Sequence, residues 1–385
     1  MAELDPACEN VTEYLKQLTP QVRSRLLAEL ERLHLLGESV PRSEALMAAL
    51  RAEFRDTGQT HYRIGNPSRY FFEPLEPVLV NSAPERVNSG QIARGSLAPI
   101  WSLISEKLLP SMAADYIASA KKVIVNNNSS EAQRIAAVFR NKVLTYLNGV
   151  LGSADGIATV RAGLEAYTTS RAIFDDLMKT VRLMHAHEAL VEFSGRLAPK
   201  IKALDSDSLT KVLGLLDALR TKHADVVPFA LTITANRLET PWQLICVATR
   251  VAGSQAVSKI AATPYALAVP MVIDKIDEKR LMLLDALRHN RIPAGKEILD
   301  EIYAIEEALR ARVALDGSDW GNRLQDLMTA IETALDAEIN SLPTDQRHLT
   351  HVLASSRQRG AQSLRGRLGD MIRKGRQAVT EMLPG

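Results

Sequence analysis

The chain has 385 residues and a formal net charge of +2; 46% of its residues are hydrophobic, 24% are charged and 5% are aromatic. The composition is close to that of soluble globular proteins, and the length exceeds that of a single hydrophobic core, so we expect two or more packed units. The scarcity of aromatic residues argues against a sheet-rich protein, because sheets favour aromatic and β-branched side chains whereas helices build cores from Leu, Ala, Ile and Met.

The two cysteines, Cys8 and Cys246, lie far apart in the sequence. This usage argues against a disulfide framework and fits a reducing compartment. The first six residues lack the charge and the apolar run of a signal peptide, and no stretch approaches 18 uninterrupted apolar residues. We therefore expect a soluble, cytoplasmic protein without a transmembrane segment.

The first predicted elements are helices. Thr19 and Pro20 mark a helix start, a capping hydroxyl followed by a proline suited to the first turn, and Gly37 ends the helix. A second helix begins in the run 41–44, and both carry apolar residues at helical spacing. With a short helix over 11–18, they predict an N-terminal helical group at 1–56.

Residues 57–99 interrupt the helical pattern with a segment that we call the strap. It holds five prolines, which remove backbone donors and disfavour helix at the preceding residue, so we expect extended backbone and turns. Two short apolar runs, 78–80 and 87–92, are predicted to pair as a hairpin. The strap is the one long ordered connector in an otherwise helical chain.

The strap also gathers aromatic and basic side chains, a combination that is enriched at binding hot spots. The candidate partner-binding residues are Tyr62, Arg63, Arg69, Tyr70, Phe71, Phe72 and Trp101. A second interpretation, which we favour, is that Phe71 and Phe72 insert into the helical core while the prolines stiffen the strap.

A central helical domain is predicted at 100–290. Pro110 is expected to break its first helix, and a capping box of Asn128 and Glu131 to start a helix that buries Ile135, Val138, Phe139, Val143 and Leu147. Further helices are predicted near 157–167, 170–194, 206–222, 240–251 and 274–288. A second capping box is expected at 240–243, and the apolar stretch 226–273 is expected to form the core.

The C-terminal part is amphipathic over 294–340, and the turn 317–319 is expected to reverse the chain into an αα-hairpin within a unit at 291–354. The predicted fold class is therefore all-α: a multi-helix bundle or irregular helical array with one long proline-rich connector and a C-terminal αα-hairpin.

A basic tail follows at 355–385. Its candidate anion-binding residues, which give a local charge of +6 together with Asp370, are Arg357, Arg359, Arg365, Arg367, Arg373, Lys374 and Arg376. The rest of the chain carries about −4, so the tail is expected to dock on an acidic surface of the same protein or a second copy, on a protein partner, on an anionic membrane or on nucleic acid.

Common catalytic motifs are absent from the sequence: it has no phosphate-binding glycine loop, no nucleophile elbow and no His-Glu-x-x-His. His348 and His351 share a helix face with Asp345, but no second helix supplies further metal ligands, so we expect a solvated helix face and no metal or cofactor. The adjacent pair Asp175 and Asp176 is interpreted in the same way, as surface solvation.

These observations predict a non-enzymatic cytoplasmic interaction or scaffold protein that associates with a protein partner or with itself. One alternative is peripheral binding to an anionic membrane or nucleic acid through the basic tail. Another is an α-helical enzyme in which Arg63, Arg69 or Arg94 holds an anionic substrate in a pocket under the strap.

Overall fold

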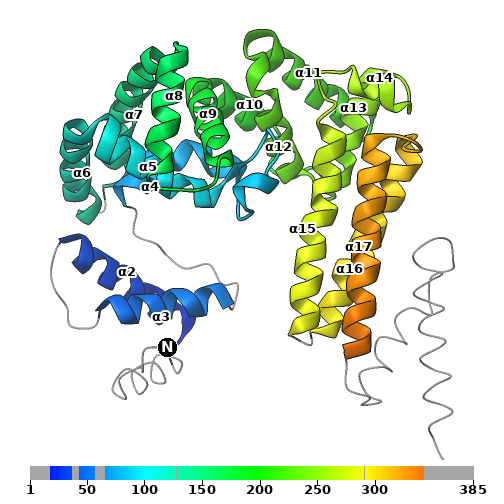
Figure 1. Ribbon diagram of the computed structural model, residues 1–385, viewed down its shortest axis with the longest axis horizontal. Helices are drawn as coiled ribbons and strands as arrows, with labels where there is room; N and C mark the ends of the chain where they lie inside the picture. The colour runs from blue at the N-terminus through cyan, green and yellow to red at the C-terminus, as the bar shows by residue number, and fades with distance from the viewer. Residues whose placement is uncertain (1–17, 37–42, 57–65, 127, 290, 342–385) are drawn as a thin grey trace, which may run out of the picture. The chain divides into compact units, whose positions relative to one another are not determined.

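The computed structural model describes residues 18–36, 43–56, 66–126, 128–289 and 291–341 (Figure 1). These residues form sixteen α-helices and two short strands, which confirms the predicted all-α fold. The chain divides into two compact units, one up to Glu188 and one from Ala189. This division falls inside the predicted domain at 100–290, and the predicted domain boundaries stay predictions.

The first two described helices are α2 (Pro20–Leu36) and α3 (Ser43–Asp56). As predicted, Thr19 caps α2: its Oγ1 accepts a hydrogen bond from the Val22 amide at 3.4 Å. The two helices share a small core of Leu27, Leu30, Met47 and Leu50. The predicted helix over 11–18 lies almost entirely outside the described residues.

The strap contains helix at 67–78, so the prediction of extended backbone and turns is wrong there. Helix α4 (Pro67–Phe72) is followed by a 3-10 helix, η1 (Glu73–Val78). Pro67 occupies the first helical position, where its missing amide hydrogen breaks no helical bond, and the Asn66 side chain caps the helix by accepting from the Arg69 amide at 2.7 Å. Pro74 and Pro84 likewise lie at the start of 3-10 helices.

The predicted hairpin in the strap is also wrong. The strands β1 (Leu79–Val80) and β2 (Ile92–Ala93) pair in parallel, with Leu79 opposite Ile92. The connection between them contains the 3-10 turn η2 (Pro84–Arg86). A parallel pair requires the chain to cross back before the second strand begins, and these residues provide that crossover.

The rest of the first unit is a series of helices. They are η3 (Arg94–Ser96), α5 (Leu97–Ser102), a π-helical turn η4 (Leu103–Leu108), α6 (Pro110–Val125), α7 (Ser129–Leu151), α8 (Ala154–Glu165), α9 (Ala172–His185) and α10 (His187–Arg196), which crosses the unit boundary. The break at Pro110 is as predicted. Only half of the first capping box forms: Asn128 accepts from the Glu131 amide, whereas the Glu131 carboxylate pairs with Arg134.

The second unit continues with α11 (Ser206–Lys222), η5 (Ala224–Val226), α12 (Val227–Arg237), η6 (Pro241–Leu244), α13 (Ile245–Ala252), α14 (Val257–Ala261), α15 (Ala268–Arg288), α16 (Ile292–Arg312) and α17 (Asp319–Ser341). Helix α12 is buried on nearly all sides, as predicted. The prediction of a second capping box is wrong. The Thr240 side chain makes no capping bond and instead accepts a hydrogen bond from Gln243 Nε2 at 2.5 Å.

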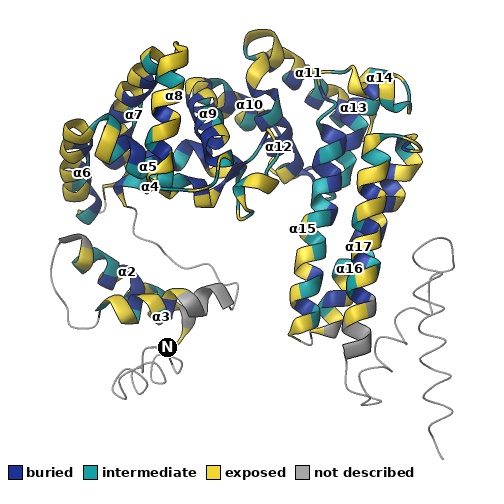
Figure 2. Ribbon diagram, in the orientation of Figure 1, coloured by how far each residue is buried: buried dark blue, intermediate teal, exposed yellow. Residues whose placement is uncertain are grey.

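Three long helices, α15, α16 and α17, lie side by side in the second unit (Figure 1), and α15 packs against both others. Gly317 has a φ of +70°, which allows the predicted turn between α16 and α17. Ion pairs link the helices, Lys279 to Glu301 and Arg323 to Asp274. The buried stripe of α17, visible in Figure 2, consists of Leu324, Met328, Ile331 and Leu335.

Candidate functional site

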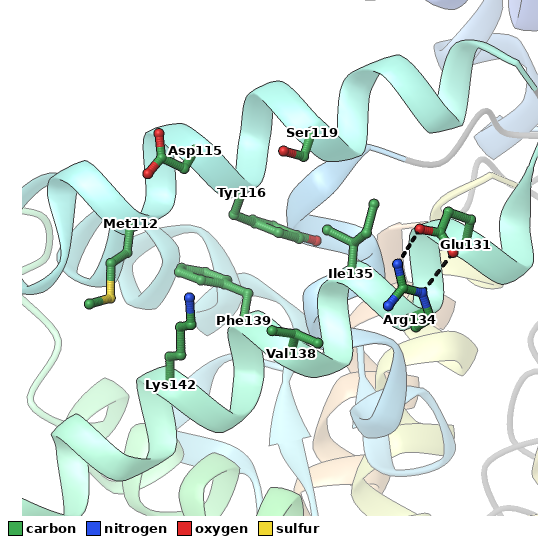
Figure 3. A pocket seen from close by; sticks show the side chains of 10 residues that line it. All are labelled: Met112, Asp115, Tyr116, Ser119, Glu131, Arg134, Ile135, Val138, Phe139 and Lys142. Carbon is green, nitrogen blue, oxygen red and sulfur yellow. Dashed lines mark hydrogen bonds and ion pairs between the residues drawn. The ribbon is translucent and has the colours of Figure 1, made fainter.

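A groove of about 360 Å³ lies between α6 and α7 in the first unit (Figure 3). The two helices are joined by a short turn and pack against each other as a hairpin. The side chains that line the groove are Met112, Asp115, Tyr116, Ser119, Glu131, Arg134, Ile135, Val138, Phe139 and Lys142.

The lining follows helical spacing on both sides. On α6 the residues are spaced i, i+3, i+4 and i+7 from Met112 to Ser119, so they form one continuous stripe. On α7 the lining from Glu131 to Lys142 follows the same rule. The groove is thus bounded by one face of each helix, over about two turns of α6 and three turns of α7.

The floor of the groove is aromatic. The rings of Tyr116 and Phe139 are stacked, with centroids 4.5 Å apart and an interplanar angle of 7°, and both side chains are buried. The Tyr116 hydroxyl donates a hydrogen bond to the Pro67 carbonyl oxygen at 2.6 Å. Burial raises the pKa of Tyr116, so the hydroxyl stays protonated and keeps this bond.

The walls expose large apolar side chains. Met112 on α6 is 46% exposed and Val138 on α7 is 50% exposed, and Figure 2 shows both helices with an exposed face. Ile135, further along α7 than Val138 when seen from Met112 (Figure 3), is half-buried. These side chains give the groove partly exposed apolar walls.

The rims carry charge in a defined pattern. At one end of the groove Asp115 on α6 and Lys142 on α7 project from opposite helices (Figure 3), and within the described residues neither forms an ion pair. At the other end Glu131 and Arg134 neutralise each other at 2.6 Å. One rim is therefore acidic and the other basic at the same end.

The strap supports the groove from behind. Phe71 lies 5.5 Å from Phe139 and 5.4 Å from Trp101, between ring centroids, and is 1% exposed; Phe72 is 4% exposed. Arg140 on α7 donates to the Tyr70 and Phe71 carbonyl oxygens at 2.7 and 3.3 Å. Burial lowers the pKa of Arg140. These contacts agree with the interpretation of Phe71 and Phe72 as core side chains.

The other strap residues predicted to bind a partner are spread out. Arg69 is exposed, Trp101 is half-buried among the aromatic rings, and Tyr70 is half-buried with its hydroxyl 3.3 Å from Ser129 Oγ. Tyr62 and Arg63 lie outside the described residues, so the role of this surface in partner binding stays a prediction.

The described residues that the alternative functions require do not line the groove. Arg94 is exposed and pairs with Glu76 at 3.1 Å, and neither Arg69 nor Arg94 lines the groove. Asp345, His348, His351 and the seven basic tail residues lie outside the described part of the chain. Within that part, no three His, Cys, Asp or Glu side chains are placed to share a metal ion.

A buried carboxylate holds the end of the strap, contrary to the expectation of surface solvation. Asp176 on α9 is fully buried and accepts hydrogen bonds from the Ala93 amide at 3.1 Å, Ser96 Oγ at 2.6 Å and Lys179 Nζ at 2.9 Å. Three donors offset the cost of burying the charge. Asp175 beside it is exposed, so adjacent acids in the sequence have opposite environments.

The groove itself was not predicted, because Val138 was expected on the buried face of its helix. The buried face of α7 runs through Ala132, Ala136, Phe139 and Val143, and Val138 lies about 100° away from Phe139. One sequence signal could have indicated the groove. Ile135 and Val138 share a helix face with the charged residues Glu131 and Lys142, and a face that carries charges at both ends is usually exposed.

The fold and the groove define this protein as a two-unit helical array with an open helix–helix groove. No family model matches the chain, and no match was found among the curated proteins or the solved structures. None of the described helices has both the length and the apolar character that a membrane span requires.

Proposed function

We propose that this chain is a non-enzymatic, cytoplasmic interaction or scaffold protein, and that it binds a helical segment of a protein through the groove between α6 and α7. The observation that supports the proposal is the exposure of Met112 and Val138 on facing helices above an aromatic floor. Filling the groove would remove these side chains from water, at roughly 25 cal/mol for each Å² of apolar surface.

A helix is the occupant that suits this surface. The lining consists of two stripes of helical spacing, and a helix packs on such a stripe by placing its own apolar stripe against it. The second unit contains such an arrangement: α17 packs on α15 with a continuous buried stripe, and Arg323 at its start pairs with Asp274.

The proposal is tested by placing a photo-crosslinking amino acid at Val138 in the full chain. We expect a covalent protein adduct at this position, and we expect Met112→Lys in the same chain to remove it. The control is the same amino acid at Val191, a valine of α10 with a similar exposed fraction of 56%, combined with Met282→Lys.

An adduct at Val138 that survives Met112→Lys would contradict the proposal, because the captured protein would then not depend on the apolar walls. A chain that gives no adduct at Val138 under native conditions would also contradict it.

A further inference from the structure

We infer that the occupant of the groove is a second copy of this chain: two α6–α7 hairpins pack face to face about a two-fold axis that runs along the groove. This inference rests on the proposed function and names its partner. The product is a four-helix bundle made of two hairpins, in which the exposed walls of both copies become the core.

The helix directions suit this bundle. Helices α6 and α7 of one copy are antiparallel, since a short turn joins them. A two-fold rotation about an axis along the groove preserves the direction of each helix and exchanges the two sides, so α6 of one copy lies over α7 of the other. Every neighbouring pair in the bundle is then antiparallel, as in up-down four-helix bundles.

The charges on the rims are self-complementary under the same rotation. Asp115 and Lys142 lie at the same end of the groove on opposite helices (Figure 3). The rotation leaves both residues at the same height along the groove and exchanges the α6 side with the α7 side. Asp115 of each copy therefore comes close to Lys142 of the other. An isologous interface requires such a pairing of unlike groups, and two identical ion pairs form.

The rotation also covers the exposed apolar side chains. Met112 lies at the Lys142 end of the groove and Val138 lies further along it (Figure 3). The rotation keeps these heights, so Met112 of one copy comes over the aliphatic part of Lys142 of the other, and Val138 comes over the middle of α6. The neutral pair of Glu131 and Arg134 closes the other end without repulsion.

The available area places the dimer among small interfaces. Helix α6 has 16 residues and is therefore about 24 Å long. Two adjacent helices are about 20 Å wide, so each copy contributes a face of about 500 Å² and the dimer buries about 1,000 Å² in total. This is the lower end of specific interfaces, and we expect a dimer that dissociates in the micromolar range.

The first test is sedimentation velocity of the full chain from low-micromolar to several hundred micromolar concentration. We expect a monomer that converts to a dimer as the concentration rises. Met112→Lys should remain a monomer throughout, whereas Met282→Lys, at a methionine of equal exposure in the second unit (47%), should dimerise like the unchanged chain. A chain that stays monomeric at every concentration would overturn the inference.

The second test exchanges the charges. Asp115→Lys and Lys142→Asp each place like charges opposite one another, and each should weaken self-association about tenfold. A mixture of the two variants should form a heterodimer more tightly than either variant forms a homodimer, because unlike charges then face each other at both contacts. Lys121→Glu and Glu165→Lys, which are exposed and outside the groove, serve as controls.

The outcomes separate the inference from the proposed function. A monomeric chain whose Val138 position still captures a different protein would overturn the inference and leave the proposed function standing. A dimer whose charge-exchanged variants show no preference for the mixed pair would overturn the inference as well. A chain that neither dimerises nor captures a protein at Val138 would overturn both.

Discussion

Two helical hairpins of this protein differ in where a third helix packs on them. The hairpin of α15 and α16 in the second unit carries α17, whose side chains Leu324, Met328 and Ile331 are at most 1% exposed. The hairpin of α6 and α7 in the first unit leaves Met112 and Val138 about half exposed. In the first unit α4 packs against both α6 and α7, yet a groove between these two helices stays open.

The difference shows where the stability of each hairpin originates. The second unit ties its helices together with apolar contacts and with the interhelical ion pair of Arg323 and Asp274. The first unit holds its hairpin through α4, α8 and α9, through the aromatic side chains of the strap and through the hydrogen bond from Tyr116 to Pro67. These contacts leave the groove between α6 and α7 open.

The largest effect that tests this comparison is expected in α17, which packs on the hairpin of α15 and α16. Leu324→Ala should lower the free energy of unfolding by about 2–5 kcal/mol, because it leaves a cavity at a fully buried position. Val138→Ala, at low protein concentration, should change it by less than about 0.5 kcal/mol. Urea unfolding followed by circular dichroism measures both, and equal losses would show that the two hairpins do not differ.

The buried carboxylate that holds the strap gives the next effect. Asp176→Ala should destabilise the protein by about 2–3 kcal/mol, because Ser96 and the Ala93 amide lose a buried charged acceptor and Lys179 loses its partner. Asp175→Ala, at the exposed neighbour, is the control and should be nearly neutral. Thermal unfolding that is unchanged in Asp176→Ala would contradict the assigned role.

The bond between the groove floor and the strap should have a smaller effect. Tyr116→Phe removes the hydroxyl that donates to Pro67 and should cost about 1 kcal/mol while leaving the stacked rings in place. Tyr146→Phe, on the exposed side of α7, provides a matched control. If both variants unfold at the same urea concentration as the unchanged chain, the strap does not support the groove through this bond.

The smallest effect is a pH dependence at the junction after α9. Burial, and then the charge of Arg140, lower the pKa of His187 below its ordinary value of 6.5, although Glu188 and Glu73 oppose the shift. His187 therefore binds a proton more readily in the unfolded chain than in the folded protein. The stability that is fully present above pH 6.5 falls as the pH drops from there through the lower pKa of the folded protein. His187→Gln should make the free energy of unfolding depend less on pH in this range. His185→Gln, at an exposed site, is the control and should leave the dependence as it is.

Sequence reasoning recovered the helices, because their periodicity and starts depend on local residues. Thr19 with Pro20, Asn128 and Gly317 each have the effect that local chemistry predicts. The interpretation of Phe71 and Phe72 as core side chains also agrees with the structure, since adjacent aromatic residues in a stiff segment have few other ways to avoid water.

The candidate site could not be predicted in the same way, because it depends on which side of a helix its neighbours leave uncovered. Val138 and Phe139 are adjacent and both apolar, yet one is exposed and the other forms the groove floor. The burial of Asp176 likewise depends on donors that lie about eighty residues earlier in the chain. No pattern within one helix contains this information.

The most direct test of the open groove compares two methionines within the same molecule. Met112 and Met282 are 46% and 47% exposed, so hydroxyl radicals should oxidise them at similar rates at low protein concentration. As the concentration rises, the account predicts that Met112 becomes protected while Met282 keeps its rate. A ratio of the two oxidation rates that does not change with concentration would contradict the account.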